Sequence, residues 1–466
     1  MLFDLLKYRN NRAVETENGN SYTYEDLHSV AEAVVSGLKP RRLTFCLCEN
    51  TMGSLAGYVG LMNAGMPTVL LDGSKDIGII RTLAEHYLPQ YIWMPTRRIA
   101  ELGKGTPVKS YEDYTMLQWA DEEYEIHPDM LLCLTTSGTT GSPKLVKLTE
   151  RNLKSNAEAI AEYLKITEKE RAITSLPMYY SFGMSVINSH LIKGATLLLT
   201  DKAVIQRNFL NFLKDGRATS IAGVPYTYEM LRRLRFLKMD LPNLKTMIQA
   251  GGKLNANIVK EYVENARQTG KEFIVMYGQT EAAPRMSYLP FDKAIEKYAS
   301  IGIAIPGGKL SVHDVNDQEI TTPDVDGELI YEGPNVCMGY AECIEDLAKG
   351  DENHRVLHTG DVAKFDNDGY FYITGRMKRF VKVWGNRCNL DAAEQLVKSI
   401  TTNCACVGVD DKITVFVIEE GLDDKIKTFL VDKTGLNIRA FEVKVIENIP
   451  TLPSGKLDYQ TMQKMI

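Results

Sequence analysis

The segment 133–149, CLTTSGTTGSPKLVKLT, groups residues whose side chains and backbone can bind phosphate. Gly138 and Gly141 allow the backbone to turn and to expose successive N–H groups. The hydroxyl side chains around them add donors, and Lys144 adds a point charge that suits phosphate. An ordinary hairpin turn is the alternative, but such turns are usually shorter. We predict a strand, a phosphate-binding loop and a second strand, with these binding residues: Thr135, Thr136, Ser137, Gly138, Thr139, Thr140 and Lys144.

This loop differs from a P-loop, because that motif places Gly-Lys-Ser/Thr at the start of a helix. It resembles the signature loop of the acyl-adenylate-forming superfamily, which includes acyl-CoA synthetases, the adenylation domains of peptide synthetases, and luciferases. Four further motifs follow in the order of that superfamily: Tyr-Gly-x-Thr-Glu at 277–281, Thr-Gly-Asp at 359–361, Gly-Arg at 375–376 and Gly-Lys at 455–456. The resemblance therefore extends over nearly the whole chain and is closest to the acyl-CoA synthetases.

The motif at 277–281 suits the ATP and Mg²⁺ chemistry that the resemblance implies. Tyr277 would stack on adenine, next to Gly278, and Thr280 would donate a hydrogen bond to an α-phosphate oxygen. Glu281 would hold Mg²⁺, an ion that takes one or two carboxylates together with phosphate and water. The resemblance thus makes Thr280 and Glu281 catalytic residues and Glu281 the metal ligand.

Five other residues complete the nucleotide and catalytic site that the resemblance implies. Asp361 would accept hydrogen bonds from the ribose hydroxyls, and Arg376 would bind the ribose or the phosphates. Lys456 would reach the reacting carboxylate and the α-phosphate; its short segment alone is better explained by a solvated terminal lysine, and the other motifs reverse that preference. Gly251 and Gly252 would let a flat base approach the backbone, although a plain tight turn also explains this dipeptide.

An aromatic bend at 177–183 leads into an apolar helix and resembles the wall of the superfamily's acid pocket. Tyr180 occupies the position of the aromatic gate, and Val224 and Tyr226 are assigned to the same pocket. Gly183 stands where peptide-synthetase domains carry an Asp that pairs with the substrate ammonium. Burying an ammonium group without that partner is costly, so free α-amino acids are disfavoured. The alternative is that these aromatic residues only pack in the core.

In the superfamily a small C-terminal domain rotates about a hinge between two half-reactions, and Lys378 matches that hinge. Gly385 would leave room for a pantetheine arm, and Arg387 is assigned to cofactor binding. The sequence departs from the family pattern at one place: Ala392 stands where Glu is common, while Glu394 keeps the second acidic position. This departure concerns the docking of the small domain and leaves the chemistry intact.

The order of elements predicts an α/β fold. A buried strand at 43–48 and a helix and strand within 51–72 favour parallel βαβ packing. Short strands separated by turn signals follow from about residue 300 and favour a small β-barrel or twisted sheet. We expect a large N-terminal domain of several subdomains over residues 1–375, a hinge at 376–379, and a small mobile α+β domain over 380–466.

Composition narrows the class of protein. The chain has 466 residues, more than one hydrophobic core usually serves, so at least two domains are expected. Its net charge of −6 argues against a nucleic-acid-binding or membrane-binding surface, and no apolar run is long enough for a membrane span. The eight cysteines include two C-x-C pairs in strand-like runs, which indicate reduced core cysteines rather than zinc ligands. A cytoplasmic location is therefore expected.

The resemblance implies that the chain activates a small carboxylic acid with ATP and transfers the acyl group to the thiol of coenzyme A. The first alternative is a stand-alone ligase that loads the phosphopantetheine of an acyl carrier protein. The second is a nucleotide-binding protein without ligase activity, which would need a damaged catalytic set. The acid stays open, because Tyr180, Tyr226 and Tyr228 would narrow the pocket for a short or aromatic acid, while helices rich in Met and Ile suit longer chains.

Overall fold

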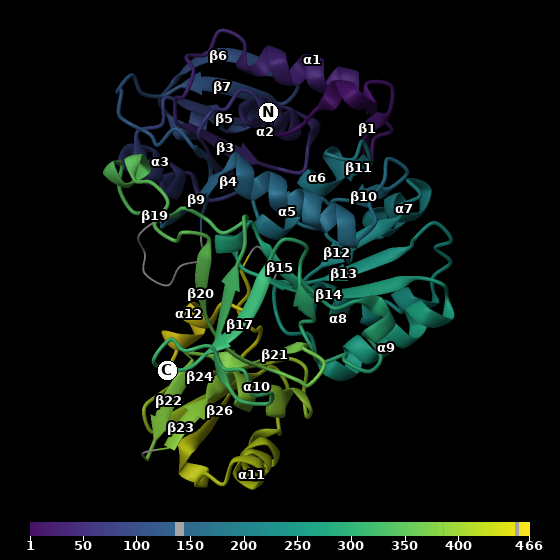
Figure 1. Cartoon of the computed structure of the whole chain (residues 1–466), viewed down its shortest axis with the longest axis vertical. Coiled ribbons are helices and arrows are strands. Elements are labelled where there is room, and N and C mark those ends of the chain that lie inside the picture. Colours follow the sequence, from purple (N-terminus) through teal and green to yellow (C-terminus); the bar gives the residue numbers. More distant parts are fainter. Residues whose placement is uncertain (136–143, 378, 385, 453–455) are drawn as a thin grey trace.

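The computed structural model describes residues 1–135, 144–377, 379–384, 386–452 and 456–466, and only the backbone of residues 380, 386 and 387. Two large sheets form the upper part of the molecule in Figure 1, and the C-terminal elements lie below them. Short 3-10 turns occur at η1 (Leu5–Tyr8), η2 (Thr96–Arg98), η3 (Phe236–Lys238), η4 (Thr280–Ala282), η5 (Phe291–Lys293), η6 (Glu345–Ala348) and η7 (Ile438–Ala440).

The first sheet has the strand order β19-β9-β8-β4-β3-β5-β7-β6. Its central strands β8, β4, β3 and β5 run parallel, and β9 and β7 pair with them in the antiparallel sense. The strands are β3 (Thr44–Cys48), β4 (Thr68–Asp72), β5 (Tyr91–Pro95), β6 (Thr106–Tyr111), β7 (Tyr114–Gln118), β8 (Met130–Thr135), β9 (Leu145–Thr149) and β19 (Gly339–Ala341). The helices of this part are α1 (Tyr24–Val35), α2 (Met52–Asn63), α3 (Ile77–Tyr87) and α4 (Ile99–Leu102).

The second sheet has the order β16-β15-β14-β13-β12-β10-β11-β1-β2. Its strands are β1 (Arg12–Thr16), β2 (Ser21–Thr23), β10 (Arg171–Ile173), β11 (Thr196–Leu199), β12 (Ser220–Gly223), β13 (Thr246–Gln249), β14 (Glu272–Gly278), β15 (Arg285–Tyr288) and β16 (Ile303–Ala304). Its helices are α5 (Glu150–Tyr163), α6 (Ser181–Leu191), α7 (Arg207–Asp215), α8 (Pro225–Arg233) and α9 (Ala256–Gln268). One core cluster joins residues of both sheets with α2 and α6, and every residue of α6 is buried.

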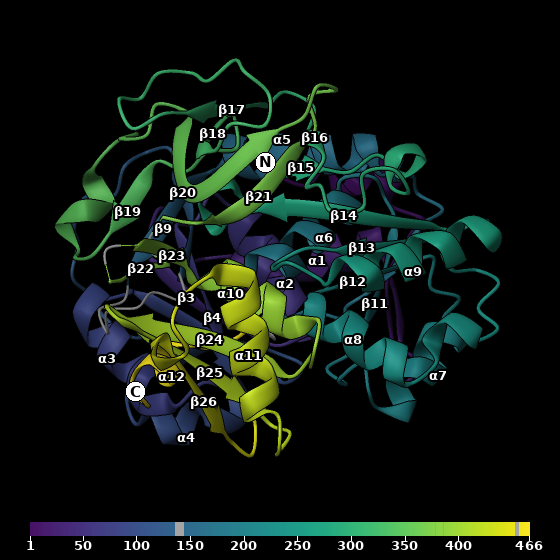
Figure 2. The same ribbon diagram turned by 90° about the horizontal axis from the view of Figure 1, so that it is seen from below.

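The remaining elements form a third sheet and a C-terminal unit, which faces the viewer in Figure 2. The third sheet is antiparallel and consists of β17 (Lys309–His313), β18 (Gly327–Glu332), β20 (Val356–Phe365) and β21 (Phe371–Arg376). The C-terminal unit consists of β22 (Phe380–Val383), β23 (Asn386–Asn389), α10 (Leu390–Lys398), β24 (Cys404–Val409), β25 (Lys412–Val417), α11 (Asp423–Thr434), β26 (Phe441–Val445) and α12 (Tyr459–Gln463).

These elements confirm the predicted α/β class and several local predictions. Parallel pairing of β3 with β4 through α2 is the βαβ arrangement expected from residues 43–72. Asn389 caps α10, and its side-chain oxygen accepts hydrogen bonds from the N–H groups of Asp391 and Ala392. All eight cysteines are free and six are buried, including both C-x-C pairs. Within the residues that the structure describes, no helix is long and apolar enough to cross a membrane.

The junction between the third sheet and the C-terminal unit explains the glycine of the Gly-Arg motif. A Cβ atom at Gly375 would collide with the side-chain nitrogen of Asn389. That nitrogen donates a 2.8 Å hydrogen bond to the Thr374 carbonyl, while the side-chain oxygen of Asn389 caps α10. A larger residue at position 375 would therefore break the direct link between β21 and α10.

Glu394 of α10 holds the C-terminal unit together. Its side chain is buried and forms ion pairs with Lys398 at 2.9 Å and Arg379 at 3.5 Å. The Tyr459 hydroxyl donates to both carboxylate oxygens at 2.9 and 3.0 Å, and the Cys406 backbone N–H donates at 3.1 Å. Because Tyr459 follows Lys456 closely in the chain, this cluster also anchors the segment that carries the predicted catalytic lysine.

The substitution Glu394→Gln should therefore destabilise the C-terminal unit by about 3 kcal/mol, because Lys398 loses its buried counter-charge and Arg379 keeps only Asp391. Thermal and urea unfolding of the full chain would measure this change. The matched control is Glu420→Gln, which removes the same charge from an exposed position and should leave stability nearly unchanged. Equal stability of the two variants would contradict the role assigned to Glu394.

Candidate active site

Asp361 lies at the centre of a polar cluster built from three strands or strand ends. Strand β20 places it opposite Arg376 of β21, and the Arg376 Nε donates to Asp361 Oδ1 at 2.8 Å. Gln279, just beyond β14, donates its side-chain N–H to Asp361 Oδ2 at 2.9 Å. The Tyr277 hydroxyl donates to the same oxygen. The predicted nucleotide residues Tyr277, Asp361 and Arg376 therefore form one connected group, and Gln279 is an addition that was not predicted.

The electrostatics of this cluster keep a carboxylate available for further donors. Burial, together with the Asp361 charge, raises the pKa of Tyr277 well above its usual range, so its hydroxyl stays neutral and donates. The Asp361 carboxylate in turn raises the pKa of Arg376. A carboxylate offers about four acceptor positions, and three are used by these partners. The cluster can accept one more hydroxyl, which is the contact expected with a ribose.

A second group joins the end of the predicted phosphate loop to the predicted metal ligand. Strand β19 pairs with β9 and places Tyr340 beside Lys144, whose Nζ lies 3.7 Å from the centre of the Tyr340 ring. The Tyr340 hydroxyl donates to Glu281 Oε1 at 2.9 Å. No sequence pattern predicts Tyr340, because it acts through partners that are far away in the chain. The structure thus brings Lys144 and Glu281 to the same side of the molecule.

Glu281 fits the metal role that was predicted for it. Its Oε1 accepts one hydrogen bond from Tyr340, and among the described residues it has no ion-pair partner. A single carboxylate of this kind matches Mg²⁺, which completes its shell with phosphate oxygens and water. Thr280, next to it, has its hydroxyl 3.3 Å from the hydroxyl of Ser181 at the start of α6.

Lys456 lies near Tyr180, which was predicted for the acid pocket, and near Gly251, which was predicted for the nucleotide site. Its Nζ is 5.2 Å from the centre of the Tyr180 ring. A Cβ atom at Gly251 would lie 2.7 Å from the Tyr180 hydroxyl, 3.0 Å from Val224 Cγ1 and 3.5 Å from Lys456 Cε. Gly251 also has a φ of +81°, so a glycine is required here both for conformation and for space. The lysine of the C-terminal unit therefore meets the end of β13 and the aromatic bend.

Gly183 has a structural reason in addition to its predicted one. A Cβ atom at this position would collide with the Pro177 carbonyl oxygen, because the aromatic bend folds tightly back on α6. The same carbonyl accepts a 3.1 Å hydrogen bond from the Tyr180 N–H. The bend therefore excludes any side chain at position 183, including a carboxylate that could pair with a substrate ammonium.

Some of the other predicted residues lie in the described part of the chain, and the rest lie outside it. Tyr226 is 47% exposed at the start of α8, whereas its neighbour Tyr228 is a core residue whose hydroxyl donates to the Ile248 carbonyl at 2.8 Å. Gly278 is needed because a Cβ atom there would collide with the Pro284 carbonyl, and Gly252 follows Gly251 directly. Thr135 is the last residue of β8. Predicted residues outside the described part are Thr136, Ser137, Gly138, Thr139, Thr140, Lys378 and Gly385, and only the backbone of Arg387 is described.

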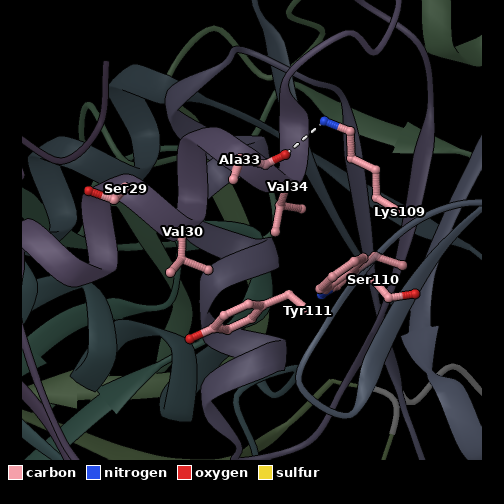
Figure 3. Close-up of a pocket in the computed structure, with 8 residues that line it drawn as sticks. Ser29, Val30, Ala33, Val34, Lys109, Ser110 and Tyr111 are labelled. Carbon is pink, nitrogen blue, oxygen red and sulfur yellow. Dashed lines mark hydrogen bonds between the residues drawn. The ribbon is translucent and has the colours of Figure 1, made fainter.

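A pocket of about 390 Å³ lies elsewhere, between α1 and β6, and is drawn in Figure 3. Lys109 lies along one side of it and donates to the Ala33 carbonyl at 2.8 Å, and Val30, Val34 and Tyr111 supply apolar surface. None of its eight lining residues belongs to the predicted site. The pocket is therefore separate from the chemistry described above.

Comparison with known proteins identifies relatives of the chain. A family model described as AMP-binding enzyme matches residues 5–341. Oxalate–CoA ligase of Arabidopsis thaliana is 26% identical over 97% of this chain and 95% of its own length. Feruloyl-CoA synthase of an Amycolatopsis species is 30% identical over 61% of this chain, and the match spans only 57% of that relative. The ATP-bound structure of MatB from Rhodopseudomonas palustris has a TM-score of 0.82 at 22% identity, covering 100% of this chain and 97% of that one, and shows the shared fold.

Measurement of ATP binding tests the role of the Asp361 cluster. Replacing Asp361 with Asn removes the charge that Arg376 and a ribose hydroxyl would share, so we expect ATP affinity to fall by about tenfold or more. Isothermal titration calorimetry with ATP and Mg²⁺ would measure the change. Asp240→Asn, at an exposed position, is the matched control. An unchanged Kd in a correctly folded Asp361→Asn variant would remove Asp361 from the nucleotide site.

Proposed function

This chain belongs to the AMP-binding enzyme family, and we propose that it is an AMP-forming ligase that joins a carboxylic acid to the thiol of coenzyme A. The observation that carries the proposal is the contact of Lys456 with Tyr180 and Gly251, next to a connected Tyr277, Asp361 and Arg376 cluster. Lys456 from the C-terminal unit thus meets residues of the large N-terminal part, as expected for a site that holds both an acid and a nucleotide.

In the proposed first half-reaction, a carboxylate oxygen of the acid attacks the α-phosphorus of ATP. The bond from that phosphorus to the bridging oxygen breaks, and pyrophosphate leaves with the electron pair. Charge spreads over phosphate oxygens in this step, so the protein contributes positioning and fixed positive charge rather than proton transfer. Lys456 would stabilise the charge on the α-phosphate, Thr280 would donate to it, and Lys144 would hold the terminal phosphates. Mg²⁺ held by Glu281 would neutralise phosphate charge.

In the proposed second half-reaction, a thiolate attacks the acyl carbon of the mixed anhydride and AMP leaves. We propose that residues 380–466 rotate about the hinge 376–379, at Lys378, relative to residues 1–375. The arrangement with Lys456 against Tyr180 suits the first half-reaction. Rotation would separate this pair and strain the Asn389 hydrogen bond to the Thr374 carbonyl, which spans the hinge. Gly385 and Arg387 would then line the path of the pantetheine arm.

The identity of the acid substrate and the identity of the thiol acceptor rest on different observations. The names of the relatives specify oxalate, feruloyl and long-chain fatty acyl groups, so similarity alone favours no single acid. Position 183 has no room for a carboxylate, which supports the exclusion of free α-amino acids. An acyl carrier protein presents the same phosphopantetheine thiol as coenzyme A and is the alternative acceptor. A non-catalytic role would require loss of Lys456, Glu281 or Asp361, and all three are present.

The role of Lys456 is tested by measuring the two half-reactions separately. We expect Lys456→Ala to lower the rate of adenylation by about 100-fold to 1,000-fold, because a fixed charge at the α-phosphate is lost. Thiolysis of a synthetic acyl-adenylate by coenzyme A should continue at nearly the normal rate. Lys464→Ala, in the exposed last residues of the chain, is the control. Equal loss of both half-reactions would overturn the assignment of Lys456 to the first one.

The overall activity is tested by ATP–pyrophosphate exchange over short, medium, long, aromatic and amino acids, followed by addition of coenzyme A. Exchange with one class of acid, and acyl-CoA on addition, would establish the proposed ligase. Exchange without acyl-CoA would favour a carrier protein as acceptor. Absence of exchange with every acid would count against the ligase and favour a non-catalytic nucleotide-binding protein.

A further inference from the structure

Arg285 is a buried cation without a counter-charge. It begins β15, four residues after Glu281, and its side chain is only 1% exposed. No ion pair with a carboxylate involves it among the described residues, and the positions outside them contain no Asp or Glu. Burial lowers the pKa of Arg285, yet a guanidinium remains protonated in proteins. An unpaired buried charge is expensive for the fold, so its presence calls for a partner.

The groups around the guanidinium are all neutral. Its Nε donates to the Ser185 hydroxyl at 3.2 Å, and its Nη1 contacts the Met276 sulfur, which is a weak acceptor. Its Nη2 has no hydrogen-bond partner among the described residues. The Phe182 ring covers the face of the group, with Cζ 4.2 Å from the ring centre. The Tyr163 hydroxyl interacts with the guanidinium, but burial raises the pKa of Tyr163 to about 12, so this hydroxyl supplies no negative charge. The edge formed by Nη1 and Nη2 is therefore short of strong acceptors.

The position of Arg285 is fixed by its backbone. Its carbonyl oxygen accepts hydrogen bonds of 2.9 Å from the side chains of both Asn156 and Asn335. Both asparagines are buried, and they come from α5 and from the segment after β18. The backbone of Arg285 is thus held by two other parts of the fold, which restrict the position of its side chain as in a preorganised binding group.

Helix α6 sets the distance between Arg285 and the proposed reacting centre. Ser181 and Ser185 are four residues apart on the same face of this helix, so their side chains lie about 5–6 Å apart. The Ser181 hydroxyl lies 3.3 Å from the Thr280 hydroxyl, and the Ser185 hydroxyl binds Arg285. The predicted α-phosphate residue Thr280 and the unpaired cation Arg285 therefore contact adjacent turns of one buried helix. Tyr180 and Phe182, whose rings are 6.3 Å apart, connect Lys456 to Arg285 on the same wall.

We propose that Arg285 binds a second carboxylate of the substrate, so that the acid activated by this protein is a short dicarboxylic acid. This inference rests on the proposed ligase function and specifies its substrate. One carboxylate reacts near Thr280 and Lys456, and the other pairs with the free edge of Arg285 about one helical turn away. This separation corresponds to diacids in the range of succinate to adipate. A cation at this place also opposes the ammonium group of an α-amino acid.

The test compares acids that differ only in the second carboxylate: succinate with butyrate, glutarate with pentanoate, and adipate with hexanoate. ATP–pyrophosphate exchange by the full chain should favour the best diacid over its matched monoacid by about 100-fold or more in kcat/KM, because a buried charge is left unpaired by the monoacid. The variant Arg285→Met should lose that preference, mainly through a higher KM for the diacid. Arg285→Lys keeps the charge without the planar fork and should be intermediate. The control Arg267→Met removes an exposed charge and should behave as the unaltered chain.

Stability separates a binding role from a structural one. Without substrate, Arg285→Met should have a Tm equal to or above that of the unaltered chain, because a buried unpaired charge is replaced by an apolar side chain. A lowered Tm with unchanged acid preference would show that Arg285 only supports the fold, and would overturn the proposal.

The remaining outcomes distinguish this proposal from the ligase function itself. Efficient exchange with monoacids, unchanged by Arg285→Met, would refute the diacid and leave the ligase intact. Absence of exchange with every acid would refute the ligase. The change in Tm on addition of glutarate would then test whether Arg285 binds a dicarboxylate. A rise in Tm for the unaltered chain but not for Arg285→Met supports a dicarboxylate site. Equal changes in Tm for the two proteins would rule the site out.

Discussion

The contact between Lys456 and the wall formed by Tyr180, Val224 and Gly251 is the constraint on which the rest of the candidate site depends. The lysine belongs to the C-terminal unit, whereas the wall belongs to the second sheet and the bend before α6. Gly251 gives this wall its shape, because the residue has a positive φ and a side chain there would collide with the Tyr180 hydroxyl and press on Val224. A single methyl group there would push against the tyrosine hydroxyl and the valine, and would displace the groups that have to meet the substrate.

Helix α6 gives this site its rigidity. It lies in the core shared by the two large sheets, and all its residues are buried, so packing on every side fixes its position. Its first two turns carry Ser181 toward Thr280 and Ser185 toward Arg285. The spacing between the reacting centre and the buried cation is therefore set by helix geometry rather than by a loop. A site supported in this way can discriminate between acids that differ in one charged group.

The buried charges of Glu394 and Arg285 differ in how well neighbouring groups compensate them. Glu394 has two cations and three hydrogen bonds from other groups, so its burial strengthens the C-terminal unit. Among the described residues Arg285 has only neutral partners, namely two hydroxyls, a thioether and an aromatic ring, so its burial costs stability. Uncompensated charge of this kind is typical of binding sites, where stability is given up for interaction with a ligand.

The sequence by itself determined the family, the α/β class and the local elements, because these depend on residues that are close together in the chain. The cap at Asn389 and the buried C-x-C pairs follow from short patterns of this kind. Only the tertiary structure decided that Tyr340 links Lys144 to Glu281, that Tyr228 belongs to the core, and that position 183 excludes a side chain. It alone showed that Arg285, in an ordinary strand-like segment, has no counter-charge. The physical reason is that burial and pairing depend on groups distant in sequence, and a linear pattern contains no information about which of them is missing.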